Sequence, residues 1–239
     1  MNPESNQPET TDHKFDDYAQ NYDAALAQGL SVTGESKEYF ARGRLEWLRG
    51  YLQKSGITPR CVLDFGCGTG SATPYFFEVL DVQKVIGVDV SPRSLEVARN
   101  TWSTYRHAHF LSIQEFNEWN TVDLVFCNGV FHHIPIAERA EAIAFIHRSL
   151  RPGGCFALWE NNPWNPGTRW VMGRCPFDDD VITLSPPQAR HLVQNGGLKL
   201  ARTDFLFLFP RALKYFRPLE ARLSSWPLGA QYQVLSRKP

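Results

Sequence analysis

The stretch "VLDFGCGTG", residues 62–70, decides the fold. It is an apolar run that ends in glycines at positions 66, 68 and 70, which is typical of a strand entering a tight loop before a helix. Glycine has no Cβ atom, so a ligand can come close to the backbone of such a loop. The start of the following helix would add free N–H groups and a positive end. The stretch therefore predicts a strand–loop–helix unit that holds a ligand.

Strands and helices alternate on the C-terminal side of this loop. Near-continuous apolar runs predict five strands, at 61–65, 84–90, 108–113, 121–129 and 155–160. Amphipathic runs between them predict helices, and this alternation is typical of a parallel sheet covered on both faces. Two further strands are expected at 198–210 and 229–239, with a helix at 211–223 between them. The fold class predicted is a doubly wound, Rossmann-like α/β sheet of seven strands.

The chain divides into three predicted regions. Residues 1–13 are polar and contain proline, so we expect a disordered tail. Residues 14–56 carry apolar side chains at helical spacing and form a predicted helical cap. Residues 57–239 form the main domain, with an insertion around 161–185 that is rich in proline and tryptophan and is interpreted as a wall of the substrate site.

Composition excludes several classes of protein. Lys plus Arg and Asp plus Glu both number 25, so the chain has no overall attraction to nucleic acid or to an anionic membrane. The five cysteines form no C-x-x-C pair, which predicts a reducing compartment without disulfides or zinc. No His, Cys, Asp or Glu cluster has metal-ligand spacing. No apolar stretch reaches the roughly 20 residues that span a bilayer, and no signal peptide is visible, so a cytoplasmic protein is expected.

The residues around the glycines narrow the choice of ligand. A P-loop would need a lysine after its last glycine, and none is present. A dinucleotide-binding loop prefers G-x-G-x-x-G, whereas the spacing here is G-x-G-x-G. Asp64 before the loop would repel a pyrophosphate and would suit an ammonium group. Asp89 ends the second predicted strand, where a carboxylate accepts hydrogen bonds from ribose hydroxyls. S-adenosylmethionine has the amine and the ribose and no phosphate.

Three stretches resemble the class I S-adenosylmethionine-dependent methyltransferases that act on small molecules. "VLDFGCGTG" resembles their first motif, "GVDVS" (87–91) their acidic second motif, and "LRPGG" (150–154) the turn before their fifth strand. The resemblance implies that the last strand is antiparallel, that S-adenosylmethionine is the methyl donor and that S-adenosylhomocysteine is a product. It implies a small-molecule acceptor, for which an aromatic or lipid-like compound is considered.

The resemblance also assigns the cofactor residues. It places the three glycines under the methionine part, Asp64 near the ammonium and Asp89 at the ribose, and it places residues 90, 112 and 113 around the adenine. "FDDYAQNYD" (15–23) resembles a signature whose tyrosine closes over the cofactor, although that residue could equally serve helix packing. The assigned residues are Tyr22, Asp64, Gly66, Gly68, Gly70, Asp89, Val90, Ser112, Ile113, Asn128 and Val130.

Candidates for catalysis follow the fourth predicted strand. Methyl transfer from an activated donor needs orientation, and a hydroxyl acceptor also needs a base. His132 and His133 in "FHHI" (131–134) are the candidate bases, with packing as the alternative role. Oxygen is therefore the first acceptor atom considered, and nitrogen and carbon remain open. A non-catalytic S-adenosylmethionine binder and an NAD-dependent oxidoreductase are the alternative functions.

Two other stretches have competing interpretations. "NNPW" (161–164) resembles a motif of nucleic-acid N-methyltransferases, but it follows the fifth strand instead of the fourth and has one proline instead of two, so nucleic-acid methylation is not expected. "FLFLFPRALKYFRPLEARL" (205–223) is both apolar and basic. It could contact a lipid-like substrate or a membrane surface, but a buried strand followed by a helix is the preferred interpretation.

Overall fold

The computed structural model describes residues 33–173 and 181–239, which form a seven-stranded sheet with strand order β3-β2-β1-β4-β5-β7-β6. The strands are β1 (Cys61–Phe65), β2 (Lys84–Asp89), β3 (Ala108–Ser112), β4 (Val122–Asn128), β5 (Leu150–Asn161), β6 (Lys199–Leu206) and β7 (Gln231–Arg237). Neighbouring strands from β3 to β5 pair in parallel, and β7 is antiparallel to both β5 and β6. The predicted fold class and the antiparallel last strand are confirmed.

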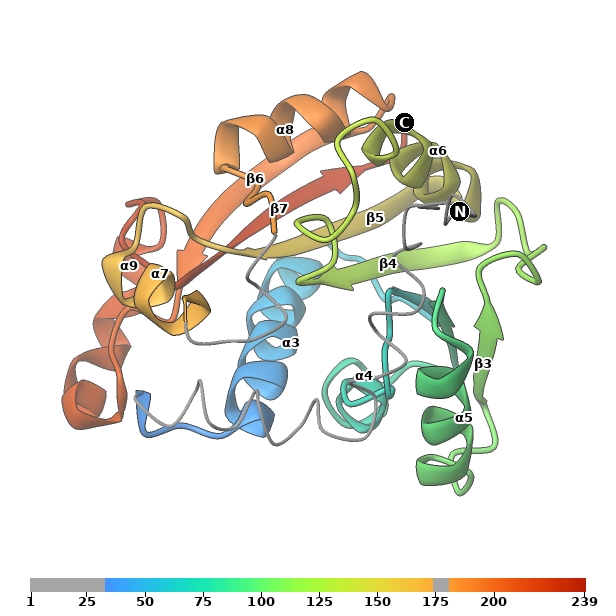
Figure 1. The fold of residues 1–239 in the computed structure, drawn as a ribbon, viewed down its shortest axis with the longest axis horizontal. Helices are drawn as coiled ribbons and strands as arrows, with labels where there is room; N and C mark the ends of the chain where they lie inside the picture. The colour runs from blue at the N-terminus through green and yellow to red at the C-terminus, as the bar shows by residue number, and fades with distance from the viewer. Residues whose placement is uncertain (1–32, 174–180) are drawn as a thin grey trace, which may run out of the picture.

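Helices cover both faces of the sheet, so the molecule has three layers (Figure 1). One face packs against α3 (Lys37–Lys54), α4 (Thr73–Leu80) and α5 (Pro92–Thr101). The other face packs against α6 (Arg139–Ser149) and α8 (Pro186–Asn195). The remaining elements follow β5 and β6, and they are α7 (Pro166–Met172), the 3₁₀ helix η2 (Arg211–Leu219) and α9 (Glu220–Leu223).

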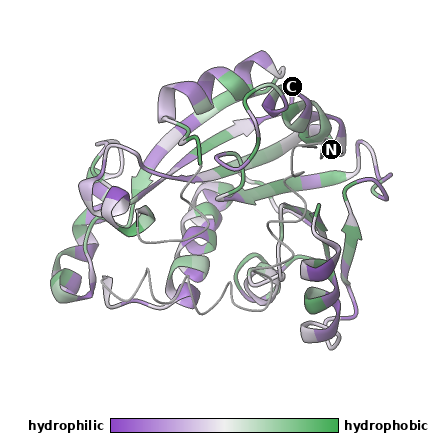
Figure 2. Ribbon diagram, viewed as in Figure 1, coloured by the Kyte–Doolittle hydropathy of each residue, from purple (hydrophilic) through white to green (hydrophobic). Residues whose placement is uncertain are grey.

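Helix α3 is part of the layered core. Its side chains Leu45, Leu48 and Leu52 are fully or almost fully buried, and they join the apolar cluster that includes Phe76 of α4 and Trp159 of β5. In Figure 2 the central strands are largely apolar in colour, and α3 alternates between apolar and hydrophilic segments. The sequence places α3 in a predicted helical cap, and in the structure this helix packs on the sheet. The boundary of the predicted cap near residue 56 remains a prediction.

Two elements differ from their sequence-based expectations. Strand β5 begins at Leu150 instead of residue 155, because the Arg-Pro-Gly-Gly turn lies beside the end of β7. Gly153 N–H donates to the Lys238 carbonyl, and Lys238 N–H donates to the Gly154 carbonyl. The expected helix at 211–223 is a 3₁₀ helix followed by a four-residue α-helix, with Pro218 inside the 3₁₀ helix. Within residues 33–173 and 181–239, no helix is long and apolar enough to cross a membrane.

The direction of the strands sets the location of the site. Because β6 is antiparallel to β7, and β7 is antiparallel to β5, β6 runs in the same direction as β1 to β5. The carboxyl ends of six strands therefore lie at one edge of the sheet. The glycine loop, the loop after β4, α7 and the connection between β6 and β7 all leave from this edge (Figure 1). Ligands of open α/β sheets bind at such an edge, near the point where strand order reverses. Here that point lies between β1 and β4.

Candidate functional site

The glycine loop after β1 is held against β2 by its backbone. The N–H groups of Gly66 and Cys67 both donate to the carbonyl of Val88, at 2.8 and 3.0 Å. The glycines at 66, 68 and 70 all have positive φ, at +72°, +52° and +72°. Residues with a Cβ atom rarely adopt this conformation, so the sequence of the loop fixes its shape.

The three glycines face different surroundings. A Cβ atom on Gly66 would lie 2.4 Å from a methyl group of Val130, and one on Gly70 would lie 2.9 Å from Trp102 and Phe110. A Cβ atom on Gly68 would meet nothing within 4 Å. Gly66 and Gly70 are therefore required for packing inside the protein. Gly68 borders open space, where a ligand can approach the backbone.

Asp89 lies at the end of β2, directly beside the loop. One carboxylate oxygen accepts a hydrogen bond from Gly68 N–H at 2.7 Å, and the other accepts from Ser91 N–H at 2.9 Å. A carboxylate can accept about four hydrogen bonds, and hydroxyl groups are suitable donors to it. The next residue, Val90, is 42% exposed and offers an apolar surface beside the carboxylate.

Asp64 is a buried carboxyl group in β1. Burial is the main reason that its pKa is raised to about 7, the negative charge of Asp89 raises it further, and Arg44 of α3 acts in the opposite direction. A cationic ligand group at Asp64 would favour the ionised carboxylate. Arg44 also donates from Nε to Gln231 Oε1 at 3.0 Å. Sequence reasoning missed Arg44, because a lone arginine on an amphipathic helix carries no signal for a site.

The remaining predicted cofactor residues lie along the same edge. Ser112 ends β3, and Ile113 N–H donates to the Asp89 carbonyl at 3.2 Å, which places both residues beside the acidic strand end. Asn128 ends β4, and its buried side-chain oxygen has no hydrogen-bond partner within the described part of the chain. A buried acceptor without a donor is costly, so this atom suits a ligand donor. Tyr22 lies outside the described residues.

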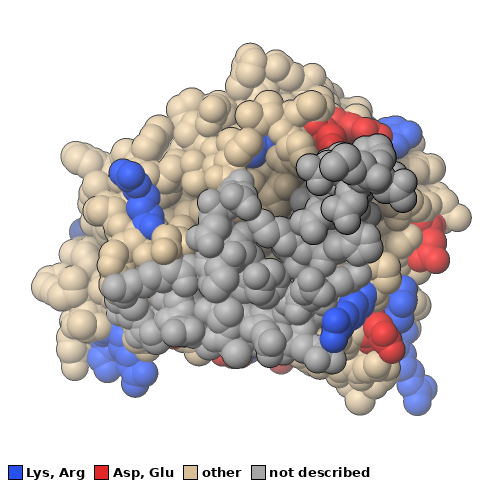
Figure 3. All heavy atoms as spheres, in the orientation of Figure 1, with Lys and Arg blue, Asp and Glu red and all other residues tan. Residues whose placement is uncertain are grey.

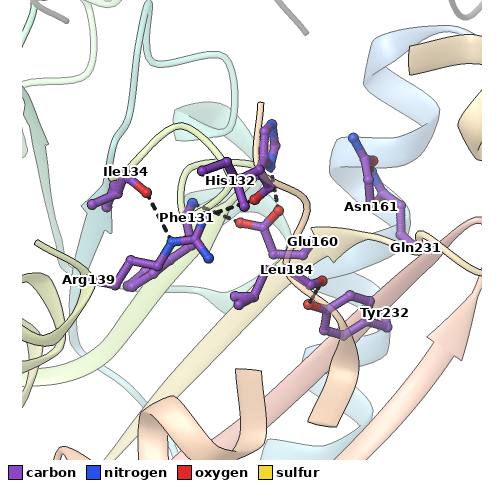
Figure 4. A network of polar contacts seen from close by, with 10 residues as sticks. Phe131, His132, Ile134, Arg139, Glu160, Asn161, Leu184, Gln231 and Tyr232 are labelled. Atoms are coloured by element: carbon purple, nitrogen blue, oxygen red, sulfur yellow. Dashed lines mark hydrogen bonds and ion pairs between the residues drawn. The ribbon is translucent and has the colours of Figure 1, made fainter. Parts of the chain in front are cut away.

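A buried carboxylate holds His132. Glu160, near the end of β5, approaches His132 Nδ1 to 2.5 Å with one oxygen, and its other oxygen accepts from Phe131 N–H at 2.8 Å (Figure 4). The side chains of His132 and Glu160 are 5% and 1% exposed. A carboxylate on Nδ1 fixes the ring orientation and favours a proton on that nitrogen. The His133 ring lies 4.1 Å from the His132 ring, measured between centroids.

The loop that carries these histidines is anchored from several sides. Arg139 of α6 donates to the carbonyls of Ile134 and Ile182, at 2.9 and 2.8 Å, and Ile182 N–H donates to the His132 carbonyl at 3.3 Å. The Tyr232 hydroxyl donates to the Leu184 carbonyl at 2.6 Å (Figure 4). These bonds tie the loop after β4 to the segment before α8. The sequence did not indicate this support, which joins residues that are far apart in the chain.

The predicted substrate wall after β5 divides into two kinds of residue. Asn162 is fully buried, and its side-chain amide donates to the carbonyls of Pro227 and Gly229, so it holds the turn before β7. Trp164 and Trp170 are 51% and 43% exposed. The insertion as a substrate wall remains a prediction. Within the described ranges, no group of three or more His, Cys, Asp or Glu side chains could hold a metal ion.

The layered fold, the glycine loop and the acidic ends of β1 and β2 define the class I methyltransferase architecture. A family model described as "Methyltransferase domain" matches residues 63–156, which contain the loop and the histidines. Residues 63–156 thus form a methyltransferase domain of the class I S-adenosylmethionine-dependent type, as the sequence motifs indicate.

Individual relatives extend the similarity. The chain is 30% identical over 166 residues to a demethylmenaquinone methyltransferase of Symbiobacterium thermophilum, covering 66% of this chain and 60% of the relative. It is 32% identical over 138 residues to a trans-aconitate 2-methyltransferase of Methylobacterium nodulans, and this match covers 55% of this chain and 52% of the relative. The chain thus spans little more than half the length of these relatives.

A solved structure shares the fold over nearly the whole chain. It is a complex between the Haloferax volcanii Trm112 methyltransferase activator and a putative methyltransferase, with a TM-score of 0.65 and 19% identity. The alignment covers 96% of this chain and 98% of that chain. At this identity, the likeness concerns the fold.

Proposed function

We propose that this protein transfers a methyl group from S-adenosylmethionine to a small-molecule acceptor and releases S-adenosylhomocysteine. The observation that carries the proposal is the open backbone at Gly68 beside the Asp89 carboxylate. Asp89 would accept hydrogen bonds from the ribose hydroxyls, and Val90, Ser112 and Ile113 would border the adenine. The sulfonium of the donor supplies an activated methyl group, so the protein has mainly to position the two reactants.

The charges at the end of β1 fit the amino-acid end of the donor. That end carries an ammonium and a carboxylate, and the site offers the Asp64 carboxyl and the Arg44 guanidinium, whose charge acts to lower the pKa of Asp64. Asp64 would hold the ammonium, directly or through water, and Arg44 would face the carboxylate. The unpartnered Asn128 oxygen and Val130 would lie toward the sulfonium, and Tyr22 would close over the cofactor.

We propose His132 as the base that accepts a proton from the acceptor. Glu160 binds its Nδ1 and makes the charged ring favourable, so Nε2 is proposed as the nitrogen that takes the proton. The arrangement favours His132 as the base, because the Glu160 carboxylate binds its ring. Because a base is needed most for a hydroxyl, oxygen remains the first acceptor atom, and nitrogen and carbon remain alternatives.

The acceptor is proposed to be a small molecule, either aromatic or lipid-like. The names of the relatives, which refer to demethylmenaquinone and trans-aconitate, support a small molecule and span both lipid-like and polar compounds. Nucleic acid is not proposed as a substrate, since the chain has no net positive charge. A cytoplasmic location is proposed from the free cysteines Cys61, Cys67, Cys127 and Cys155.

Calorimetric titration with S-adenosylmethionine, S-adenosylhomocysteine and NAD tests the cofactor. We expect both S-adenosylmethionine and S-adenosylhomocysteine to bind. Asp89→Ala should weaken the binding of each at least tenfold, because the ribose contact is lost. Binding of NAD without binding of either sulfur compound would favour an oxidoreductase and refute the proposal. Binding without turnover across a panel of acceptors would favour a non-catalytic binder.

Variants of the two histidines test the base. His132→Ala should lower kcat by about 10²–10⁴-fold on a hydroxyl acceptor, while His133→Ala should retain most of the activity. Glu160→Gln should keep cofactor affinity and shift the pH profile of kcat, because the imidazolium loses its carboxylate partner. Full activity of His132→Ala would remove the proposed base.

A further inference from the structure

The connection between β6 and β7 exposes an unusual number of large apolar side chains. Residues 211–223, which form η2 and α9, contain no buried residue. The exposed fractions are 45% for Leu213, 83% for Tyr215, 51% for Phe216 and 43% for Leu219, and 60% for Trp226 and 48% for Leu228 just beyond. We call these six residues the apolar rim. Clusters of exposed large apolar side chains within one short segment mark binding surfaces.

The geometry of η2 separates apolar from basic side chains. A 3₁₀ helix has three residues per turn, so Phe216 and Leu219 lie on one face, and Lys214 and Arg217 lie on another. Arg217 donates to Glu35 Oε1 at 2.6 Å and lies over the Tyr39 ring. This contact anchors Arg217 to the start of α3, whereas Lys214 is exposed to solvent. The apolar face is exposed to solvent, since Phe216 and Leu219 are both more than 40% exposed.

The same segment is positively charged, although the whole chain is neutral. Residues 211–223 contain Arg211, Lys214, Arg217 and Arg222 but a single acidic residue, Glu220. Figure 3 shows basic side chains at the corner of the molecule where η2 lies in Figure 1. Apolar and aromatic side chains next to lysine and arginine are the combination by which proteins dock on anionic lipid.

The apolar rim also lies on the functional edge of the sheet. The connection starts at the carboxyl end of β6, which is the edge where the glycine loop and His132 lie. A partner surface bound at the rim would therefore face this edge. Tyr215 and Trp226 have amphipathic rings of the type that favours the boundary between lipid and water.

We propose that the apolar rim and the basic residues of 211–223 dock the protein on an anionic lipid membrane, where a lipid-like acceptor can enter the site. Docking follows from the surface alone, and only the delivery of the acceptor rests on the proposed function. Apolar side chains would enter the headgroup region while Lys214 and Arg222 contact anionic headgroups. The cytoplasmic leaflet carries such a negative surface charge.

Co-sedimentation with vesicles tests the docking. Vesicles of phosphatidylcholine alone are compared with vesicles that contain about 30% phosphatidylglycerol. We expect the full chain to bind the anionic vesicles at least tenfold more tightly, and added salt to weaken the binding. Tyr215→Ser with Phe216→Ser, and separately Lys214→Glu with Arg222→Glu, should each reduce binding at least tenfold. Trp119→Ser, a change at an exposed aromatic residue before β4 and so at the opposite edge of the sheet, should leave it unchanged.

Each other result overturns the proposal. Absence of vesicle binding, or equal binding to both vesicles, would remove the anionic membrane as the partner. Sedimentation velocity could instead show a dimer that the Tyr215 and Phe216 changes dissociate. If this dimer forms and no vesicles bind, the rim is an interface with a second copy of the chain. S-adenosylhomocysteine titration separates this proposal from the proposed function, because the rim variants should bind it normally whether or not vesicles bind.

Discussion

At the scale of single residues, the loop glycines share a left-handed backbone but serve different purposes. Gly66 accommodates Val130, whereas Gly68 keeps a space open beside Asp89. The same chemical change at the two positions should therefore affect different properties. This makes the pair a test of which part of the loop is structural and which part binds the ligand.

Gly66→Ala should lower the free energy of unfolding by about 2–5 kcal/mol, from the strained backbone and the overlap with Val130. Gly68→Ala should lower it by about 1 kcal/mol and weaken S-adenosylhomocysteine binding, because its methyl group points into open space. Urea unfolding and calorimetric titration measure the two effects. Equal losses of stability in both variants would contradict this division.

Asp64 should make stability depend on pH. Its folded-state pKa of about 7 lies above the ordinary value of 3.8, so the folded state holds the proton more tightly than the unfolded state. The stability that protonated Asp64 contributes is fully present below about pH 4, and it is lost as the pH rises through about 7. Asp64→Asn removes this dependence. The free energy of unfolding of the variant minus that of the wild type should therefore be about 2–3 kcal/mol larger at pH 8 than at pH 5. Urea unfolding at both pH values measures this, and an equal effect at both would refute it.

At the scale of elements, α3 is the clearest case of a helix whose role depends on its partners. Its apolar stripe packs on the sheet together with α4, and its polar side reaches the site through Arg44 and the sheet through Trp47, whose Nε1 donates to Asp204 at 3.1 Å. A helix that covers the sheet should unfold together with it.

Leu48→Ala should reduce the free energy of unfolding of the whole protein by about 2–5 kcal/mol, because Leu48 is fully buried in the shared core. Arg49→Ala, one residue further on the exposed side of the helix, is the matched control and should change it by less than about 0.5 kcal/mol. Circular dichroism and tryptophan fluorescence should follow one transition. Loss of α3 in a separate early transition would contradict this expectation.

At the scale of the whole molecule, the site joins segments from both halves of the chain. The glycine loop and Asp89 come from the first half of the sheet, while Glu160 and Gln231 come from β5 and β7. A ligand that contacts these parts should stabilise the folded state as a whole, since it binds only when they are assembled.

Thermal unfolding measures this coupling. S-adenosylhomocysteine at 100 times its Kd should increase the free energy of unfolding by about 2.7 kcal/mol. This increase raises Tm by roughly 5–10 °C for a domain of this size. NAD at the same concentration should leave Tm unchanged. The Asp89→Ala variant is the control and should show a smaller shift with S-adenosylhomocysteine. A rise in Tm with NAD alone would contradict the assignment of the cofactor.

Local patterns in the sequence determined the order of strands and helices and the glycine loop. Apolar periodicity and the positive φ of glycine are properties of short segments, so Asp64 and Asp89 could be placed at strand ends before any contact was known. The antiparallel last strand came from family resemblance, because strand direction at the end of a sheet is not a local property. The 3₁₀ form of 211–219 was missed, since its residues suit an ordinary helix in composition.

Only the tertiary structure decided which distant side chains meet. Glu160 and His132 are separated by 28 residues, and Arg44 and Gln231 by 187, so no spacing in the sequence could pair them. Packing of β5 beside β4 brings the first pair together, and packing of α3 over the sheet brings the second. Motifs whose residues are neighbours in the chain can be read from the sequence, but a base and its partner carboxylate become neighbours only when the sheet assembles.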